Sequence, residues 1–244
     1  RGVVVLVCTW TMATKPTKTS YEVVSIGWAI MGSSTAWLLS DNPDFSGSVL
    51  VVEKDPTYEF SSTAHTNSCI RQQFSHTLNV RISQFAADFV KNLRARMGDD
   101  DRVPNVDIQS YGYLYLADNE GFAQTLRDNQ KVQLAAGAET ELLTAEDIAA
   151  RYPFYNVDDI LLGSINTKDE GYWDGGVVFD WFRRSARERG VEYVQGEVVA
   201  MARDGGKVTP VTVAPGHVVH FGQVENPAGT ADGTTHEQDS LPLR

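Results

Sequence analysis

Residues 23–32 read VVSIGWAIMG, and this stretch decides the fold. An apolar, β-branched run at 22–26 predicts a strand, and residues 29–40 after it predict a helix. A second apolar run at 48–53 predicts another strand, with a polar stop carrying Pro and Gly before it. Strand, tight turn, helix and strand make a βαβ unit, which gives parallel strands with a right-handed crossover. We therefore predict the α/β class, with a Rossmann-like sheet.

The turn between the first strand and the helix follows the G-x-G-x-x-G pattern, with Ala29 at the second glycine position. Gly27 permits a tight turn, and Gly32 permits close approach of the helix to the strand. The helix N-terminus offers free N–H groups and a positive dipole end to a pyrophosphate. Glu53 lies 21 residues after Gly32, where a carboxylate accepts hydrogen bonds from ribose hydroxyls. We expect a bound dinucleotide with the ring of Trp28 pointing outward; the alternative is a nucleotide-free doubly wound domain.

Composition and charge exclude several classes of partner. The chain has 244 residues, of which 42% are hydrophobic, and its net charge is −11. Nucleic acid is excluded as a partner because phosphate binding needs a basic face. The first apolar run, residues 2–8, is far shorter than the roughly 20 residues that span a bilayer, so no membrane partner is expected. Cys8 and Cys69 form neither a disulfide framework nor a metal pattern, which favours a reducing, cytoplasmic location and no metal.

The rest of the chain predicts further elements. Helices are expected at 81–97, 119–136 and 176–190, and a strand at 108–117. The sequence TAED at 144–147 has the spacing of a capping box before a short helix that Pro153 ends. Short strands at 191–194, 197–202, 207–213 and 217–224, with glycine turns between them, predict a small antiparallel β-meander. Residues 1–20 are interpreted as an extension or leader, and residues 231–244 as a disordered tail.

The loop after Glu53, residues 54–75, is long and rich in Ser, Thr and Asn, which is unusual for a nicotinamide domain. It contains SSTAHTNSCIRQQFS at 61–75; farther along lie EGYWDGGVVFDWFRRSARERGVEYVQGEVVAM at 170–201 and NPAGT at 226–230. Together with the turn and Glu53, these stretches resemble the glycine/D-amino-acid oxidase superfamily of FAD-dependent oxidoreductases. That group includes sarcosine oxidase and dimethylglycine dehydrogenase, and the resemblance covers residues 21–230.

The resemblance implies FAD as cofactor and an FAD-binding domain interrupted by a substrate domain. The FAD-binding domain is expected at 21–80 and 170–230, and a helical linker with part of an inserted α+β substrate domain at 81–169. Four positions match those that hold the ADP half: Gly27, Ala29, Gly32 and Glu53. Ser62, Thr63 and Ala64 match positions along the phosphates and ribityl chain, and Asn67, Ser68 and Cys69 those near the isoalloxazine. Val199 matches the adenine contact, and Ala228 and Gly229 match the return of the chain to the cofactor, although Glu225 and Pro227 depart from the family pattern there.

Two residues are candidates for a catalytic role. His65 resembles the histidine that some dimethylglycine dehydrogenase relatives join covalently to the flavin; a hydrogen-bonded or solvated loop histidine is the alternative. The planar fork of Arg71 suits a substrate carboxylate, and a structural ion pair is equally open. Cys69 is expected to be small, buried and inert rather than a reactive thiol. Tyr111, Tyr113 and Tyr115 are expected to pack as strand residues rather than to bind substrate.

The function implied by the resemblance is oxidation of a C–H bond next to an amine nitrogen, by hydride transfer to the flavin. The substrate is then a small amine or amino acid, such as an N-methylated glycine, and an electron-transfer protein is a possible partner. Relatives continue well past NPAGT, so a truncated, catalytically inactive fragment that at most binds a dinucleotide is the second hypothesis. Such a chain would expose apolar surface and favour homo-oligomers. A nicotinamide-dependent dehydrogenase is a third hypothesis, which the loop after Glu53 disfavours.

Overall fold

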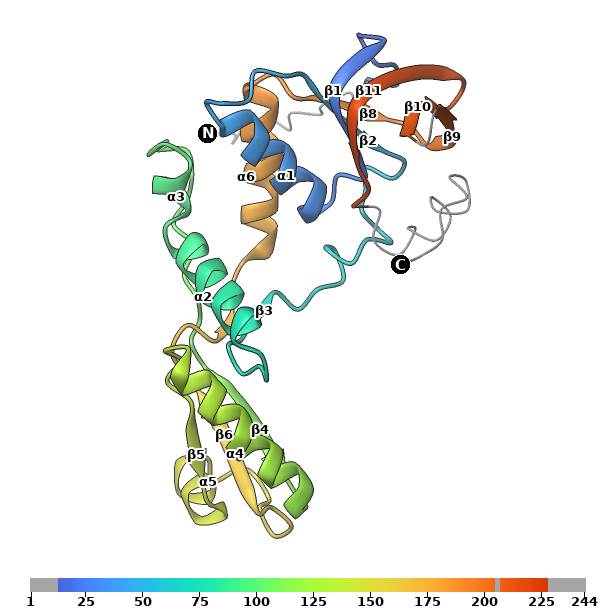
Figure 1. Cartoon of the computed structure of the whole chain (residues 1–244). Helices are drawn as coiled ribbons and strands as arrows, with labels where there is room; N and C mark the ends of the chain where they lie inside the picture. The colour runs from blue at the N-terminus through green and yellow to red at the C-terminus, as the bar shows by residue number, and fades with distance from the viewer. Residues whose placement is uncertain (1–12, 205–206, 228–244) are drawn as a thin grey trace, which may run out of the picture. The chain divides into compact units, whose positions relative to one another are not determined.

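The computed structural model describes residues 13–204 and 207–227 of the chain. The described residues divide into two compact units, one formed by residues 13–65, 179–204 and 207–227 and the other by residues 66–178 (Figure 1). The expected tail at 231–244 and most of the expected extension at 1–20 lie outside the described residues. The assignment of an FAD-binding and a substrate domain to stretches of chain stays a prediction.

The first unit is built on a six-stranded sheet with the strand order β8-β2-β1-β11-β10-β9. Strand β1 pairs in parallel with both β2 and β11, and β2 pairs in parallel with β8. Strands β9, β10 and β11 pair antiparallel with one another in sequence order. The strands are β1 (Ser20–Ile26), β2 (Val49–Glu53), β8 (Glu192–Gln195), β9 (Val198–Asp204), β10 (Lys207–Val213) and β11 (His217–Glu225). The predicted α/β class and βαβ unit are confirmed.

One strand of the predicted meander belongs elsewhere. The strand expected at 191–194 is β8, which lies in the parallel part of the sheet beside β2. Its consecutive residues Tyr193 and Val194 are both buried, so both faces of this strand are covered. That burial is typical of a parallel strand flanked by helices and not of a meander strand with one wet face. The remaining meander, β9 to β11, is as predicted.

Helices α1 (Ile30–Asp41) and α6 (Gly175–Glu188) lie side by side against the sheet (Figure 1). They meet through the rings of Trp37 and Phe182, whose centroids are 5.4 Å apart. The core on the sheet consists of aliphatic and aromatic side chains from β1, β2, β8, β9, β10 and β11, including Val24, Leu50, Val194, Val211 and Val219. Burial of these apolar side chains fixes the sheet and thereby the carboxyl ends of β1 and β2, where the predicted turn lies.

The second unit contains a three-stranded antiparallel sheet in the order β4-β6-β5 (Figure 1). Its strands are β4 (Tyr113–Ala117), β5 (Glu141–Leu143) and β6 (Leu162–Asn166). Helix α4 (Glu120–Ala135) packs on it through Ala123 and Leu126. Helix α5 (Ala145–Arg151) begins with the predicted capping box, in which Thr144 and Asp147 exchange hydrogen bonds.

Helices α2 (Thr77–Lys91) and α3 (Leu93–Arg96) replace the single helix expected at 81–97. The first helix begins earlier because the ring of His76 accepts a hydrogen bond from the Leu78 N–H and caps it. The strand expected at 108–117 is shorter, since Gly112 has φ +82° and β4 begins only after it. Tyr111 therefore lies outside the strand and is 72% exposed, so its expected strand packing was wrong.

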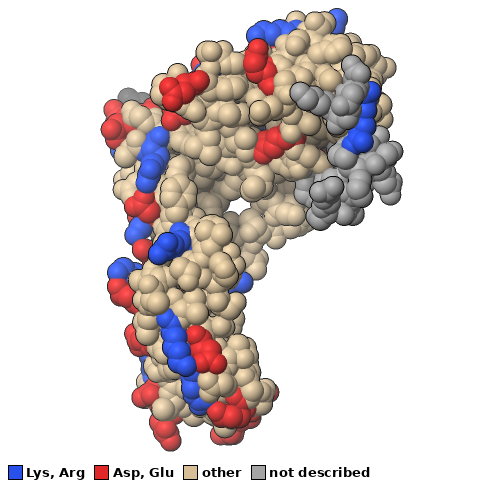
Figure 2. Space-filling model, viewed as in Figure 1, with Lys and Arg blue, Asp and Glu red and all other residues tan. Residues whose placement is uncertain are grey.

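Two short strands, β3 (Cys69–Ile70) and β7 (Gly171–Tyr172), form an antiparallel ribbon in the second unit. Neither they nor β5 and β6 were predicted, because each is short and lacks a clear alternating pattern. On the face shown in Figure 2, acidic and basic side chains are interspersed. Within the described residues, none of the helices is both long and apolar enough to cross a membrane.

Candidate functional site: the start of helix α1 and the Arg71 region

The turn before α1 requires glycine at two positions. Gly27 has φ +104°, in the region that other residues rarely adopt, and its N–H donates to the Val52 carbonyl oxygen at 2.8 Å. A Cβ at Gly32 would lie 2.0 Å from the Gly27 carbonyl oxygen, so any side chain there would push the helix off the turn. Ala29 is the N-cap of α1. We call residues 27–32 the helix mouth.

Two distant side chains reach the helix mouth. The Glu53 carboxylate accepts hydrogen bonds from the Trp28 N–H at 3.1 Å and from the Asp55 N–H at 2.9 Å. The Thr63 hydroxyl oxygen accepts from the Ile30 N–H at 3.2 Å. The end of β2 and the polar loop after it therefore both lie at the start of α1. The structure brings Gly27, Gly32, Glu53 and Thr63 together, as a shared cofactor site requires.

The Trp28 ring does not point outward, and that expectation was wrong. The residue is 0% exposed, and its ring centroid lies 5.2 Å from that of Tyr193 and 6.1 Å from that of Tyr58. The guanidinium of Arg187 lies 5.6 Å from the ring. Burial raises the pKa of Tyr193 to about 12 and raises that of Tyr58 as well, so both phenols stay neutral around the indole. The indole is thus a core side chain, packed against β8 and α6.

The electrostatics of the helix mouth suit an anion. The N-cap Ala29 makes no side-chain capping hydrogen bond, and the first turn of α1 carries no acidic side chain. The positive end of the helix dipole is therefore not compensated within its own first turn. A diphosphate at this point would accept from the amides of the turn, and Glu53 would take the adjoining ribose. The residues present fit a dinucleotide such as FAD.

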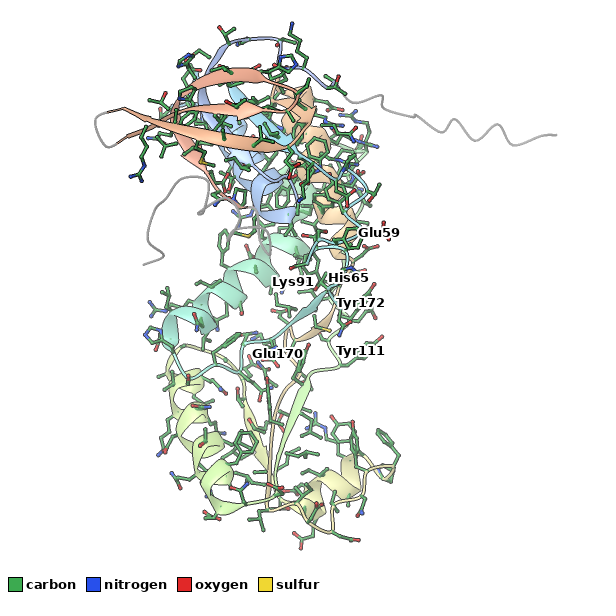
Figure 3. All side chains as sticks on the ribbon, turned by 90° about the vertical axis from the view of Figure 1, so that its right-hand side faces the viewer. Glu59, His65, Lys91, Tyr111, Glu170 and Tyr172 are labelled. Atoms are coloured by element: carbon green, nitrogen blue, oxygen red, sulfur yellow. The ribbon has the colours of Figure 1, made fainter. Side chains whose placement is uncertain are left out.

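The loop candidates lie on both sides of the boundary between the units. Ser62 and Ala64 are exposed in the first unit. His65 is exposed, and its Nε2 lies 2.6 Å from the Glu59 carbonyl oxygen (Figure 3). That contact favours a loop histidine held by its own loop over a residue free to join the flavin. Val199, in β9, is 43% exposed, while Ala228 and Gly229 lie outside the described residues.

Asn67, Ser68 and Cys69 belong to the second unit. Cys69 is exposed, so the expectation of a buried cysteine was wrong. The reason is strand alternation: in the short strand β3 the neighbouring Ile70 points inward and is buried, which turns Cys69 outward. Ser68 has φ +48°, a conformation that non-glycine residues adopt only under constraint.

Arg71 follows β3, and aromatic rings cover its cation. The guanidinium carbon lies 5.2 Å from the Phe74 ring centroid and 5.7 Å from that of Tyr113. Its Nε atom is buried and has no hydrogen-bond partner. Within residues 13–204 and 207–227, the Arg71 side chain makes no ion pair and no hydrogen bond. This disfavours the alternative in which Arg71 forms a structural ion pair. A stacked guanidinium with an unused donor fork is suited to a carboxylate ligand.

Sequence reasoning missed Glu170, a buried carboxylate that bonds the residue directly after Arg71. It is 0% exposed, and its carboxylate accepts from the Gln72 N–H at 2.6 Å, the Asn166 Nδ2 at 3.0 Å and the Gln73 Nε2 at 3.0 Å. Burial raises the pKa of Glu170, while these hydrogen bonds and the charge of Arg71 act in the opposite direction. Its one sequence signal was its place at the start of the EGYWDGG stretch. Within the described residues, no group of acidic, His or Cys side chains forms a metal site.

A glycine turn at a helix mouth, with an acid at the end of the next strand, defines an α/β protein that binds a dinucleotide. The family model for DAO, FAD dependent oxidoreductase, matches residues 22–240. The chain therefore belongs to the DAO family of FAD-dependent oxidoreductases, and its cofactor is FAD.

Curated relatives point the same way. FAD-dependent oxidoreductase domain-containing protein 1 of Xenopus laevis is 35% identical over 181 residues, which cover 72% of this chain and 36% of the relative. The Drosophila melanogaster homologue is 37% identical over 182 residues, covering 75% of this chain and 35% of the relative. Sarcosine oxidase subunit beta of an Arthrobacter species is 27% identical over 85% of this chain and 50% of its own length. The chain thus spans about a third of the first two relatives.

Solved structures confirm the fold. L-proline dehydrogenase from P. horikoshii superposes with a TM-score of 0.77 at 23% identity, over 92% of this chain and 57% of that one. Glycine oxidase from Geobacillus kaustophilus gives a TM-score of 0.74 at 16% identity, over 93% of this chain and 60% of that one. At these identities the likeness is one of fold.

Proposed function

We propose that this protein oxidises the C–H bond next to the amine nitrogen of a small amino acid or N-methylated glycine, using FAD. The observation that carries the substrate class is the stacked, unpaired guanidinium of Arg71 in the second unit. An amino acid presents a carboxylate one carbon away from the bond to be broken, which is the group that a planar fork binds best. The relative named sarcosine oxidase subunit beta supports the same class.

The first unit holds the cofactor in this proposal. Amides of the helix mouth donate to the diphosphate, while the positive φ of Gly27 and the missing Cβ of Gly32 keep the start of α1 close against the turn. Glu53 accepts from the ribose hydroxyls while it keeps its bond to the Trp28 N–H. Thr63, already at the helix mouth, lies where it can meet the same phosphates. When bound, FAD supplies the ring that accepts a hydride.

The second unit orients the substrate. The Phe74 and Tyr113 rings cover the Arg71 guanidinium and keep water from its faces, which strengthens its attraction to a carboxylate. Two parallel hydrogen bonds from the fork would fix the direction of the substrate as well as bind it. A fixed carboxylate limits which C–H bond of the substrate can be presented for transfer.

Cofactor binding is tested with the whole chain. FAD is added to the purified protein, unbound flavin is removed by gel filtration, and absorbance with mass spectrometry identifies what stays bound. Glu53→Gln should weaken FAD binding about tenfold, because a hydrogen bond to a charged group contributes about 1.5 kcal/mol. Glu22→Gln is the matched control, since Glu22 is an exposed glutamate of β1 that bonds only Ser48 in the described residues. Equal FAD binding in all three proteins would contradict the role of Glu53.

Turnover separates the proposed oxidoreductase from its alternative. Bleaching of bound flavin under anaerobic conditions by sarcosine, glycine or proline supports the proposed reaction. Stoichiometric FAD with no bleaching by any of them supports the second hypothesis, a protein that binds the dinucleotide without catalysis. A colourless pellet after acid precipitation of the FAD-loaded protein would exclude a covalent bond to His65.

A further inference from the structure

A buried polar cluster surrounds Glu170 in the second unit, and the proposed chemistry does not use it. The Glu170 cluster consists of Glu170, Gln72, Gln73, Ser164 and Asn166, all of which are buried. The Gln73 side chain donates to the Tyr113 carbonyl oxygen at 2.8 Å and accepts from the Ser164 hydroxyl at 2.8 Å. A buried network of this kind holds its members in one arrangement, since every lost partner leaves an unsatisfied group.

The cluster holds the two residues directly after Arg71. The Gln72 main-chain N–H donates to Glu170 at 2.6 Å, and the Gln72 side chain donates to the Lys168 carbonyl oxygen at 2.9 Å. Gln73 reaches the other Glu170 oxygen at 3.0 Å. The main chain and both side chains of this segment are therefore tied to the turn at 166–170.

The backbone around the cluster is constrained. Asp169 has φ +56°, and Lys91 holds its carboxylate with both oxygens at 2.8 Å. Gly171 has φ +144°, and a Cβ there would lie 2.0 Å from the Gln109 carbonyl oxygen. Such conformations persist only where the surroundings impose them, and they gather at functional sites. Figure 3 labels Glu170 and Lys91 in this region, together with the exposed Tyr111 and Tyr172.

We propose that Glu170 is a positioning residue, which holds the segment after Arg71 so that the guanidinium faces a substrate carboxylate instead of folding back onto protein. The role of Arg71 rests on the proposed function; the anchoring by Glu170 rests on its own hydrogen bonds. The Glu170 carboxylate accepts from Gln72, Gln73 and Asn166 and makes no ion pair with Arg71 in the described residues, which leaves the guanidinium fork free. The phenyl faces of Phe74 and Tyr113 then fix the plane of the guanidinium.

The test compares Glu170→Gln with Asp169→Asn in the FAD-loaded full chain. Asp169 is the neighbouring acid, and asparagine also tolerates its positive φ, so this variant controls for a change at the same turn. Three quantities are measured: binding of acetate, by line broadening of its methyl signal in NMR spectra; exchange of the Gln72 amide hydrogen; and the FAD dissociation constant. Arg71→Gln reports whether acetate binds at Arg71 at all.

We expect Arg71→Gln to abolish acetate binding and Glu170→Gln to weaken it at least about tenfold, which is the loss of one charge-assisted contact. Glu170→Gln should also speed exchange of the Gln72 amide by at least about tenfold and leave the FAD dissociation constant within about twofold. Asp169→Asn should leave acetate binding, Gln72 amide exchange and the FAD dissociation constant within about twofold of their wild-type values. A variant that had lost the fold of the second unit would also speed exchange of the amides of α4, which Glu170→Gln should leave at wild-type rates.

The outcomes separate the two proposals. Unchanged acetate binding in Arg71→Gln overturns the role of Arg71 and with it this inference. Loss of binding in Arg71→Gln with wild-type binding in Glu170→Gln overturns the inference and leaves the proposed function standing. If Glu170→Gln does not fold, Asn166→Ala removes one donor to Glu170, together with the acceptor of the Lys168 N–H, and should give the same pattern in weaker form; wild-type behaviour there overturns the inference too.

Discussion

The helix mouth in the first unit and the Glu170 cluster in the second unit differ in the atoms that build them. The helix mouth is made of main-chain amides and of the space left by Gly27 and Gly32, within six consecutive residues. The Glu170 cluster is made of side chains from the segment after β3, from β6 and from the turn before β7. One site is local in sequence, and the other exists only when distant segments meet.

This difference shows which kind of site tolerates substitution of its side chains. A backbone site tolerates many side chains around it, which is why a residue as large as Trp28 can stand in the turn as long as its ring packs into a core. A buried side-chain network tolerates few changes, because each member is a partner of several others. A substitution that disturbs the backbone of the helix mouth should therefore lower both stability and FAD binding. A substitution in the Glu170 cluster should lower stability and leave FAD binding unchanged.

The largest loss of stability is expected from Trp28→Ala. Removing a fully buried indole should lower the free energy of unfolding by about 4 kcal/mol, measured by urea denaturation. The FAD dissociation constant should change by less than about threefold, since Trp28 takes part in the helix mouth through its main chain, which the substitution keeps. Trp37→Ala, at another buried tryptophan of the first unit, should cost a similar amount. FAD binding that tightens markedly in Trp28→Ala alone would mean that the indole crowds the cofactor.

Gly32→Ala should combine a loss of stability with a loss of function. The added Cβ meets the Gly27 carbonyl oxygen, so we expect a cost of about 3 kcal/mol and no detectable FAD binding. Gly121→Ala in α4 is the control, because its Cβ would meet nothing closer than the Asn119 Oδ1 at 3.3 Å, and its effect should stay within about 0.5 kcal/mol. Wild-type FAD affinity in Gly32→Ala would refute the close approach of α1 to the turn.

Glu170→Ala, unlike Gly32→Ala, should lower stability without changing FAD binding. Three donors lose their acceptor in a buried place, so the free energy of unfolding should fall by about 2 kcal/mol. FAD affinity, measured on the folded protein by titration, should remain at the wild-type value. Loss of FAD binding in this variant would show that the two sites are not independent.

The smallest effects are expected at the capping box of α5, which belongs to neither site. Thr144→Ala removes the side-chain cap and should cost about 1 kcal/mol in thermal unfolding. Hydrogen bonds from the Thr144 backbone and side chain lower the pKa of Asp147 below 3.8. Its stabilisation is therefore present above that pH and is lost as the pH falls through the lower folded pKa. The difference in unfolding free energy between wild type and Asp147→Asn should shrink as the pH falls through the folded pKa of Asp147. A difference in unfolding free energy that persists below that pKa would exclude the ionised carboxylate as its cause.

Local patterns predicted the elements whose signals lie within a few residues. The strand, turn and helix at 22–41, the capping box at 144–147 and the antiparallel strands β9 to β11 all follow from such patterns. The predictions that failed needed knowledge of distant neighbours. The direction of the Trp28 ring depends on Tyr58 and Tyr193, and the exposure of Cys69 depends on which face of β3 meets the unit's interior.

The amino-acid sequence by itself determined the glycine turn, the acid at the end of β2 and hence the dinucleotide-binding class, because backbone conformation and spacing carry those features; FAD as the particular dinucleotide came from the family resemblance. Only the tertiary structure decided that Thr63 joins the helix mouth and that β8 joins the parallel sheet. It also decided that Glu170 is buried beneath the segment that follows Arg71. Hydrogen bonds between residues nearly a hundred positions apart leave no periodic trace in a sequence, since each partner is chosen by packing and not by spacing.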